Sequence, residues 1–434
     1  MSKHVGIIGA GLSGLRCADI LIQNGARVTI LEARDRIGGR VHQSSVGNHV
    51  VDLGPNWIHG AGENPIMNIA EATGTTMFDP EGGQHVAFAP DGQPIHDDIN
   101  SKVQDFVWTT ISEAFEYSNR HGNSIPAEKS LLDFFRERVQ QTDFSTEEKN
   151  LCLDACKLWG TYVGDQVDRQ SLRFFRLEEC VDGSNFVVAS TYKRILEHVS
   201  KTASAKANIH LSEPVTSINA PPRTPNQHHQ ITVTTTATTY NFDETSTSTV
   251  FAQFLEPTYA PHPPHIEWTQ ECLSFAALPS PHAHPTLLFY TYGESGAEII
   301  NPIHHLSPDS PEYKNILTKT LQPFYARLPG YDADSADCVP TAFLATQWQK
   351  DEYAGNGSYC NFQAGVVEAD RDIEVLRDGD GIGLLRGLWF AGEHTAPFVA
   401  LGTTTGAYWS GERVARLICR DGEVRDDSLP SGGL

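Results

Sequence analysis

The first forty residues alternate between apolar and polar positions in an order that predicts strand, helix and strand. An apolar run over residues 5–8 has the pattern of a buried parallel strand. Apolar residues then recur at three-to-four spacing over residues 12–21, which predicts a helix, and a second apolar run covers residues 27–31. This order is typical of the β-α-β unit that opens a doubly wound sheet.

Glycines at G-x-G-x-x-G spacing join the first predicted strand to the helix. Gly9 permits a tight turn, Gly11 lets the backbone approach a pyrophosphate, and Gly14 lets helix and strand pack closely. The helix N-terminus offers free N–H groups to phosphates. Glu32 ends the second strand, where its carboxylate can accept hydrogen bonds from a ribose hydroxyl. Together these features predict a dinucleotide-binding site.

Residues 100–180 are poor in glycine and carry the helical pattern, which predicts a helical wall of a second domain. Ser130 and Ser145 stand where N-caps are expected. Trp159 and Tyr162 either line a pocket in that wall or belong to its core. The predicted helices are 102–117, 131–141 and 146–161.

The rest of the chain predicts further alternation of helices and strands. Residues 254–285 have the composition of loops. The fold class that follows is α/β, with a Rossmann-like dinucleotide-binding domain interleaved with an α+β substrate domain. We expect the first domain in 1–80, 181–245 and 340–425, the second in 81–180 and 250–339, and a tail at 426–434. The individual predictions are helices at 191–200, 311–328 and 402–418, strands at 209–218, 287–292 and 388–392, and a hairpin arm at 231–239.

Composition narrows the function class. The net charge of −22 argues against nucleic acid and anionic membranes as partners, and it favours either a cationic substrate or simply solubility. No apolar run approaches the ~18 residues of a membrane span. The first strand begins at Val5, so we expect no signal peptide. The eight cysteines form no C-x-x-C pair, which favours reduced thiols in the cytoplasm, and the histidines of the Pro-rich loops do not predict a metal site.

The residues after Glu32 indicate which dinucleotide is bound. Ala33 and Arg34 are followed by Gly38, Gly39 and Arg40. This run resembles the flavoprotein amine oxidases. In that family the second glycine pair and the arginines add an anchor for the FAD pyrophosphate. An NADP enzyme could also carry an arginine here, but not the whole run, so the resemblance implies FAD. It makes the Rossmann-like domain an FAD-binding domain of the GR2 type.

A second motif resembles the fungal-like polyamine-oxidase branch of the same family. Residues 54–60 read Gly-Pro-Asn-Trp-Ile-His-Gly and are followed by Asn64 and Pro65. The resemblance implies that Trp57 lies by the flavin and that His59 faces the substrate tunnel. The alternative for His59 is a structural hydrogen bond within the loop.

The C-terminal motifs also match the amine oxidases, in the expected order. They are a Trp-x-x-Asp segment, a Gly-Ser-Tyr segment, a Phe-Ala-Gly-Glu-x-Thr signature and a final helix whose N-terminus can stabilise negative charge on a flavin. The resemblance implies that Glu393 accepts hydrogen bonds from the ribityl or phosphate side of FAD. It assigns to cofactor binding Val215 (by its backbone), Trp348, Gly392, Glu393, Thr403 and Thr404.

Two residues characterise the expected substrate site. Ser358 stands where monoamine oxidases carry the cysteine that binds flavin covalently, so FAD is expected to be non-covalent. Tyr359 matches one wall of the family's aromatic cage, and Thr403 stands in place of the other wall. The expected site is therefore more open than that of a monoamine oxidase.

One segment departs from the family. After residue 244 a member should run through an apolar strand and a Pro-Leu-Gly turn to a lysine near flavin N5. Here residues 245–254 lack both, and no lysine occurs between Lys206 and Lys314. The simplest interpretation is an internal deletion near 245–250.

The resemblance implies an FAD-dependent amine oxidase. It would oxidise a C–N bond of a polyamine or of another primary or secondary amine and reduce O2 to H2O2. We expect His59, Trp57, Tyr359 and Thr403 to shape its site. Two alternatives stay open: an oxidase of an amino acid or natural-product intermediate, with Arg173 or Arg176 binding a carboxylate, and a truncated, impaired relative.

Overall fold

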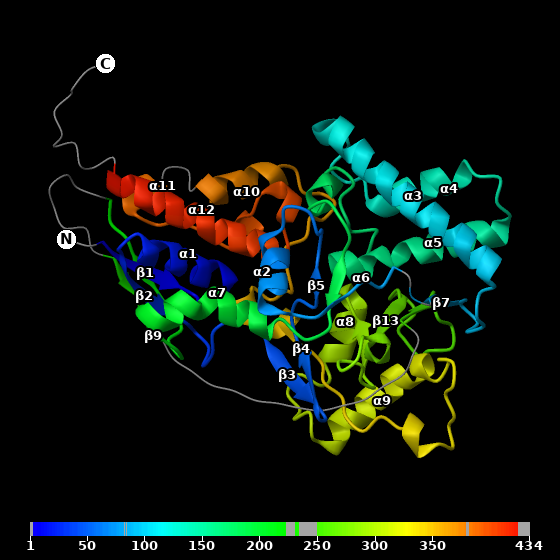
Figure 1. Ribbon diagram of the computed structural model, residues 1–434. Helices are drawn as coiled ribbons and strands as arrows, with labels where there is room; N and C mark the ends of the chain where they lie inside the picture. Colours follow the sequence, from blue (N-terminus) through cyan, green and yellow to red (C-terminus); the bar gives the residue numbers. More distant parts are fainter. Residues whose placement is uncertain are drawn as a thin grey trace.

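The computed structural model describes residues 3–81, 83, 85–222, 231–233, 250–378 and 382–423. It has two parts that lie side by side (Figure 1). One contains a small parallel sheet between helices, and the other a mixed sheet with a group of helices above it. Most of the predicted deletion, most of the predicted hairpin arm and the tail 426–434 lie outside the described residues.

The first part is built on a three-stranded parallel sheet in the order β1-β2-β9. The helix after the glycines packs against two others, one of them the final helix, and their apolar faces form one core with the sheet. The predicted opening unit and the final helix are therefore confirmed. The elements are β1 (His4–Ile8), α1 (Leu12–Gln23), β2 (Arg27–Leu31), α7 (Lys193–Lys206), β9 (Asn208–His210) and α12 (Thr404–Glu423).

Two strand predictions in this part were wrong in whole or in part. The predicted strand 209–218 is extended only as far as His210, because Ser212 takes a left-handed φ of 62° and Pro214 has no N–H for a ladder. Residues 388–392 form no strand. Within the described residues β1 pairs with β2 on one side only, and Ile8 is 49% exposed. The C-terminal segment forms no ladder with this open edge, so it lacks the paired neighbour that a strand needs.

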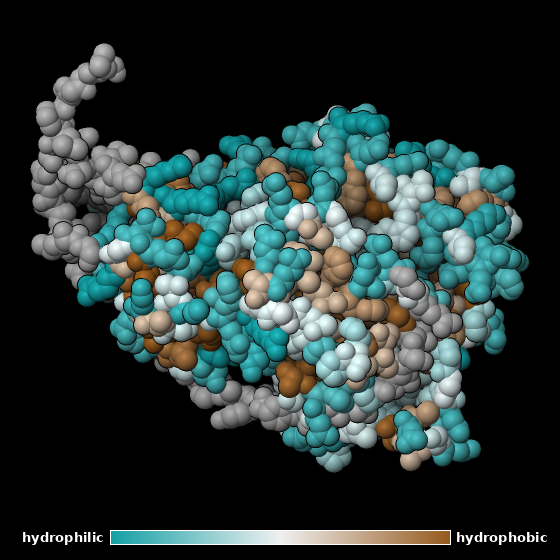
Figure 2. Space-filling model, in the orientation of Figure 1, coloured by the Kyte–Doolittle hydropathy of each residue, from teal (hydrophilic) through white to brown (hydrophobic). Residues whose placement is uncertain are grey.

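The helical wall is confirmed, with both predicted caps. Ser130 and Asp133 form a reciprocal capping box, and so do Ser145 and Glu148. The predicted helix 146–161 is in fact two helices that meet at Leu158. The wall consists of α3 (Asp97–His121), α4 (Leu131–Gln140), α5 (Thr146–Lys157) and α6 (Trp159–Val163), around an aromatic and aliphatic core. Hydrophilic side chains cover most of its outer surface on the face that Figure 2 shows.

The second sheet has the order β14-β13-β12-β7. Its central strand β13 lies in the stretch predicted as loop. The prediction of a loop was wrong. Gln270, Glu271 and Ser274 are polar, as loop residues usually are, but all three are buried in this strand. The predicted strand and helix that follow are confirmed. The elements are β7 (His85–Phe88), β12 (Phe251–Phe254), β13 (Gln270–Ser274), β14 (Leu287–Tyr290), α8 (Gly293–Ile300) and α9 (Pro311–Tyr325).

Short elements make up the rest of the chain. A β-hairpin, a three-stranded sheet in the order β5-β8-β6, and a two-stranded pair lie between the larger sheets in the chain. Thr232 and Val233 pair with Asn219 and Ile218, so the described start of the predicted hairpin arm is a strand. These elements are β3 (Gln43–Val46), β4 (His49–Asp52), β5 (Trp57–Ile58), α2 (Pro65–Thr73), β6 (Met77–Phe78), β8 (Phe186–Val188), β10 (Ile218–Asn219), β11 (Thr232–Val233), α10 (Ala369–Asp378) and α11 (Ile382–Arg386).

Candidate active site

One cavity of about 2580 Å³ runs from the glycine turn of the first part into the second part. Small-molecule pockets usually measure roughly 300–1,000 Å³, so this space can hold a large cofactor together with a substrate. Every residue predicted to bind the cofactor or to shape the amine site lines it. These are Gly9, Gly11, Gly14, Glu32, Arg34, Gly38, Gly39, Arg40, Trp57, His59, Val215, Trp348, Tyr359, Gly392, Glu393, Thr403 and Thr404.

The glycine turn has the geometry that a bound pyrophosphate needs. Gly9 takes a φ of 95°, which turns the chain from β1 into α1. A Cβ on Gly14 would lie 2.1 Å from the Gly9 carbonyl oxygen, so only glycine lets helix and strand approach this closely. A Cβ on Gly11 would meet no atom within 4 Å, and no side chain caps the N-terminus of α1. Its N–H groups therefore face open space, where an anion can bind.

Glu32 lies at the carboxyl end of β2 and is almost fully buried. Its Oε2 accepts a hydrogen bond from Ala10 N at 2.6 Å, and its Oε1 accepts one from Arg34 N at 2.8 Å. The carboxylate thus holds the glycine turn against the strand. Because an ionised carboxylate has about four acceptor positions, it can still accept from a ribose.

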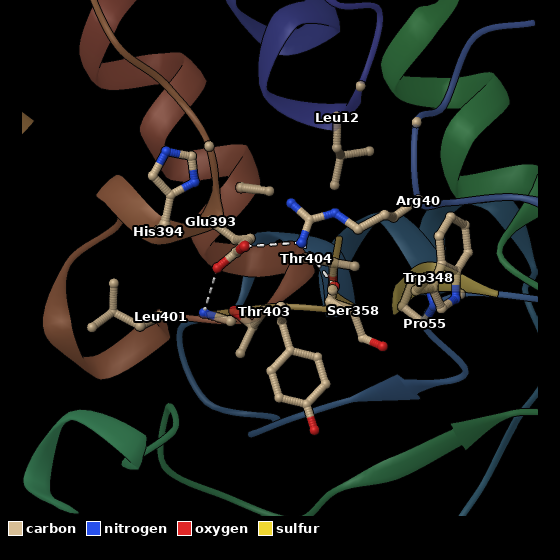
Figure 3. A pocket seen from close by; sticks show the side chains of 18 of the residues that line it. Leu12, Arg40, Pro55, Trp348, Ser358, Glu393, His394, Leu401, Thr403 and Thr404 are labelled. Carbon is tan, nitrogen blue, oxygen red and sulfur yellow. Dashed lines mark hydrogen bonds and ion pairs between the residues drawn. The ribbon is translucent and has the colours of Figure 1, made fainter. Parts of the chain in front are cut away.

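Arg40 connects the second glycine pair to the C-terminal motifs. Its Nη1 lies 2.9 Å from Glu393 Oε1 and donates to the Ser358 carbonyl at 2.7 Å. Glu393 Oε2 accepts from Gly402 N at 3.2 Å. Figure 3 shows Arg40 and Glu393 pointing toward one another across the cavity wall. One ion pair therefore positions segments that lie far apart in the sequence.

The other predicted cofactor residues are held by the protein itself. Arg34 pairs with Asp351 at 3.0 Å. Trp348 donates from Nε1 to the Leu53 carbonyl and lies beside Pro55 (Figure 3). Val215 lines the cavity from the irregular segment after β9.

Thr403 serves as the N-cap of α12. Its Oγ1 accepts from Gly406 N at 2.9 Å and donates to the Ala400 carbonyl. Thr404 Oγ1 lies 3.2 Å from the Tyr192 hydroxyl. The capped helix begins at the cavity, so the positive end of its dipole faces a bound anion.

Trp57 lies on strand β5, and His59 directly follows that strand. Trp57 donates from Nε1 to the Tyr290 hydroxyl at 3.0 Å, which ties the loop to the second sheet. His59 Nδ1 lies 3.3 Å from Asn185 Oδ1, and its ring stacks with Trp57. Burial lowers the pKa of His59, so its imidazole is neutral at pH 7. His59 therefore both lines the cavity and makes the structural contact.

Tyr359 forms one wall of the cavity. Its hydroxyl donates to the Tyr162 carbonyl at 2.6 Å, and burial raises the pKa of the phenol, which stays protonated. Within the described residues no aromatic ring stacks with it, and Thr403 lines the cavity nearby. Trp159 and Tyr162, for which core and pocket were alternatives, both line the cavity, although Trp159 also packs on the helical core.

Sequence reasoning missed three carboxyl groups of the cavity. Burial raises the pKa of Asp52, Glu178 and Glu271 to about 7 each. Glu178 accepts from Gln170 Nε2 at 3.1 Å, and Glu271 lies on β13. No motif contains them, and an isolated acid gives no local sign that its side chain is buried, so only the tertiary structure identifies them.

A sequence model described as "Flavin containing amine oxidoreductase" matches residues 12–265 and 241–419. The chain belongs to this family. It is 26% identical over 227 residues to "Probable polyamine oxidase 4" of Arabidopsis thaliana, covering 49% of this chain and 45% of that protein. Over 226 residues it is 26% identical to "Polyamine oxidase 5" of Oryza sativa subsp. japonica, covering 49% and 44%. The chain thus spans less than half the length of these curated relatives.

Two further matches widen the range of relatives. The chain is 29% identical over 151 residues to "Lysine-specific histone demethylase 1B" of Mus musculus, covering 34% of this chain and 18% of that protein. A solved structure of a redesigned putrescine oxidase superposes with a TM-score of 0.62 at 15% identity, covering 97% of this chain and all of that one. At that identity the superposition shows a shared fold and no more.

Membership of the flavin amine oxidoreductase family implies a flavin, and the residues present fit one. The open space above Gly11, the uncapped N-terminus of α1 and the remaining acceptor positions of Glu32 suit a pyrophosphate and a ribose. By contrast, the described residues contain no group of three or more His, Cys, Asp or Glu that could hold a metal ion. None of the described helices is long and apolar enough to cross a membrane.

The positions of the basic residues bear on which molecules the cavity can hold. Arg173 and Arg176 do not line the cavity; Arg176 pairs with Asp370 at 2.6 Å. Among the described residues that line the cavity, Lys3 is the single lysine, and its Nζ donates to the Ile418 carbonyl at the far end of β1. No described lysine therefore faces the second part of the cavity.

Proposed function

We propose that this protein is an FAD-dependent oxidase of a polyamine or of another primary or secondary amine, with O2 as electron acceptor and H2O2 as product. One observation carries the proposal. A single cavity joins the dinucleotide-type glycine turn to a chamber lined by Trp57, Tyr359 and buried carboxyl groups. The polyamine oxidases among the relatives support the substrate class.

A flavin held by the glycine turn, Glu32 and the N-terminus of α1 would supply a two-electron acceptor for the hydride on the carbon next to nitrogen, with O2 as the final oxidant. Overall, a secondary amine, dioxygen and water become an aldehyde, a shorter amine and hydrogen peroxide. The protein orients the C–N bond between Trp57 and Tyr359 and excludes water from it. A free amine has a pKa near 10, so these rings favour its neutral form by desolvation.

We infer that FAD is held without a covalent bond. Ser358 has a hydroxyl where a thiolate would attack, and its carbonyl accepts from Arg40. The division into a cofactor domain (1–80, 181–245, 340–425) and a substrate domain (81–180, 250–339) is part of the same proposal. None of the eight cysteines forms a disulfide, which supports a reducing compartment, the cytoplasm.

The test is an absorbance spectrum of the purified protein, followed by anaerobic titration with spermine, N-acetylspermine and a panel of L-amino acids. We expect a flavin spectrum that a polyamine bleaches, H2O2 when air is admitted, and release of free FAD on acid precipitation. The control variant is Arg173→Gln. Because Arg173 lies outside the cavity, this substitution should leave the rates of flavin bleaching and of H2O2 formation unchanged. Bleaching by amino acids alone would contradict the proposal.

One structural observation favours a second candidate, an impaired relative that binds FAD poorly. Within the described residues β1 has no partner strand on one side. The cavity runs along that open side, where His4 and Phe390 both line it. An unpaired edge in a parallel sheet leaves backbone groups without ladder bonds. Protein that stays colourless after incubation with FAD would establish this candidate and remove the first.

A further inference from the structure

Three aromatic side chains of the helical wall lie in contact with one another beside the cavity. Trp108 belongs to α3, and Trp159 and Tyr162 belong to α6. Their ring centroids lie 5.4 Å apart for Trp159 and Tyr162, 5.9 Å for Trp108 and Trp159, and 6.5 Å for Trp108 and Tyr162. Indole and phenol rings lose one electron more readily than the phenyl ring does, and rings in contact exchange an electron quickly. The three rings can therefore carry an electron between them.

The two ends of this cluster face different surroundings. Tyr162 lines the cavity, and its carbonyl accepts a hydrogen bond from the Tyr359 hydroxyl at 2.6 Å. Because Tyr359 forms a wall of the proposed reacting centre, Tyr162 connects the cluster to that centre. Trp108 is the most exposed of the seven tryptophans, at 51%. Small molecules in solution can therefore reach the cluster at Trp108.

Tyr162 also has a proton acceptor in place. A phenol that loses an electron becomes a strong acid, so its oxidation needs such an acceptor. The Tyr162 hydroxyl donates to Glu271 Oε2 at 3.2 Å. Glu271 is 1% exposed, and Gln253 Nε2 donates to the same oxygen at 2.8 Å, which fixes its orientation. Burial raises the pKa of Glu271 to about 7, so a large share of this carboxyl group is ionised at pH 7. Glu271 is thus a positioned base for Tyr162.

The two indole rings differ in where their N–H protons can go. Trp159 Nε1 is buried and has no hydrogen-bond partner among the described residues. Its radical cation cannot release that proton, and a positive charge away from water is unfavourable. An electron vacancy therefore passes through Trp159 without staying there. Trp108 is half exposed, so its oxidised ring can release its proton to water.

We propose that Tyr162, Trp159 and Trp108 form a one-electron path that reduces oxidised side chains of the cavity wall, with Glu271 as the proton acceptor of Tyr162. The need for such a path rests on the proposed formation of H2O2, whereas conduction along it does not. A protein that forms peroxide in its cavity also meets the hydroxyl radicals that peroxide yields. An oxidised ring left in the wall would add oxygen or cross-link.

Electrons and protons balance at each step. A hydroxyl radical takes one electron from the Tyr162 ring and becomes hydroxide, while the phenolic proton moves to Glu271. Trp108 then supplies one electron through Trp159, and Glu271 returns its proton, so that Tyr162 is restored. Trp108 releases its indole proton to water as it is oxidised. A thiol in solution finally donates one hydrogen atom to the Trp108 radical and becomes a thiyl radical.

The test measures electron transfer along the path in the intact chain, without any amine. Azide radicals, generated by pulse radiolysis, oxidise accessible tryptophan in preference to tyrosine. In the wild type we expect the absorption of the tryptophan radical to decay in a first-order step as the absorption of a tyrosyl radical rises. Tyr331→Phe is the matched control and should leave this step unchanged, because Tyr331 packs on Tyr325 and does not line the cavity.

Variants that keep the shape of each side chain locate the path. The transfer should be lost in Tyr162→Phe, whose ring cannot form a tyrosyl radical. It should also be lost in Trp108→Phe, because azide radicals do not oxidise phenylalanine. Glu271→Gln should slow the transfer roughly 100-fold or more, as for removal of a positioned proton acceptor. If Glu271→Gln fails to fold, the two ring variants still decide the matter, because each keeps an aromatic ring in place.

A second measurement tests repair while the protein forms peroxide. With spermine in air, glutathione should reduce the activity that the wild type loses per mole of H2O2 formed. The same thiol should give Trp108→Phe no such protection. Peptide mass spectrometry should then find added oxygen on Tyr162 or Tyr359 in this variant. Expressing the loss per mole of H2O2 removes any difference in turnover rate between the two proteins.

Several results would overturn the inference. A transfer that persists in Tyr162→Phe or in Trp108→Phe would show that other rings carry the electron. A rate unchanged in Glu271→Gln would exclude this carboxylate as the proton acceptor, and equal protection by glutathione in wild type and Trp108→Phe would exclude repair. Transfer in a protein that oxidises no amine would leave the path standing and refute the proposed function, whereas amine oxidation without the transfer would do the reverse.

Discussion

Two glycines of the same turn should respond in opposite ways to the same added methyl group. At Gly11 an alanine Cβ meets no atom within 4 Å, and the backbone conformation (φ −72°, ψ 177°) suits alanine. At Gly14 it would lie 2.1 Å from the Gly9 carbonyl oxygen and 3.2 Å from Ile7 Cγ2. The first change leaves the fold intact and fills space that we assign to a phosphate, whereas the second forces α1 away from β1.

The magnitudes follow from these contacts. Gly11→Ala gains about 0.4–1 kcal/mol from a less flexible unfolded chain and loses a similar amount because alanine is a poor N-cap. Its free energy of unfolding should therefore stay within about 1 kcal/mol of wild type. Gly14→Ala would gain about 1 kcal/mol from helix propensity, but overpacking should reverse this to a loss of about 2 kcal/mol or more.

The assay pairs urea denaturation of flavin-free protein with an FAD titration followed by flavin fluorescence. Gly11→Ala should unfold like wild type yet bind FAD about tenfold or more weakly, since the methyl group displaces a backbone–phosphate contact. Gly14→Ala should lose stability first and FAD affinity with it. A Gly11→Ala protein that binds FAD normally would refute the assignment of this turn to the cofactor.

Three further predictions concern other contacts. Ser145→Ala removes an exposed capping box and should cost about 1 kcal/mol in urea unfolding, whereas Ser145→Thr should restore the cap; equal losses would show that the cap contributes nothing. Burial raises the pKa of Asp52 from 3.8 to about 7, so its contribution is complete below pH 4 and is lost as pH rises through 7; an upper estimate is about 4 kcal/mol. The fall in melting temperature between pH 5 and 8 should be smaller in Asp52→Asn, and an unchanged fall would contradict the shift. Arg40→Gln leaves Glu393 without its cation and should cost about 1–2 kcal/mol, because the pair is partly exposed; the ratio of flavin to purified protein should fall in parallel, and full flavin content would contradict the anchor.

The sequence correctly predicted the elements that depend on interactions between residues close together in the chain. The glycine turn requires backbone conformations and a close approach that few sequences permit, and the capping serines act on N–H groups three residues away. Both were therefore identified correctly. The strand expected at 388–392 was not, because an apolar run becomes a strand only where a neighbouring strand completes its ladder.

The candidate site likewise has one part that the sequence predicted and another that only the structure showed. Its cofactor side could be predicted because motifs carry it, and every predicted residue lines one cavity. The other part of the cavity, which we assign to the substrate, is lined by residues such as Glu271, which lies on a strand that the composition did not indicate. Thr403 illustrates a further limit: the sequence placed it beside the substrate, and the structure shows that its hydroxyl also caps α12.

By itself, the sequence determined the α/β class, the dinucleotide turn, the helical wall with its caps, and the family. These depend on periodicity, glycine geometry and short spacings, all of which act within a few residues. Only the tertiary structure decided which acids are buried, which edge of the first sheet is open, and which rings share a cavity. Burial and pairing arise between segments hundreds of residues apart, and no local pattern encodes the desolvation that raises the pKa of Glu178 or Glu271.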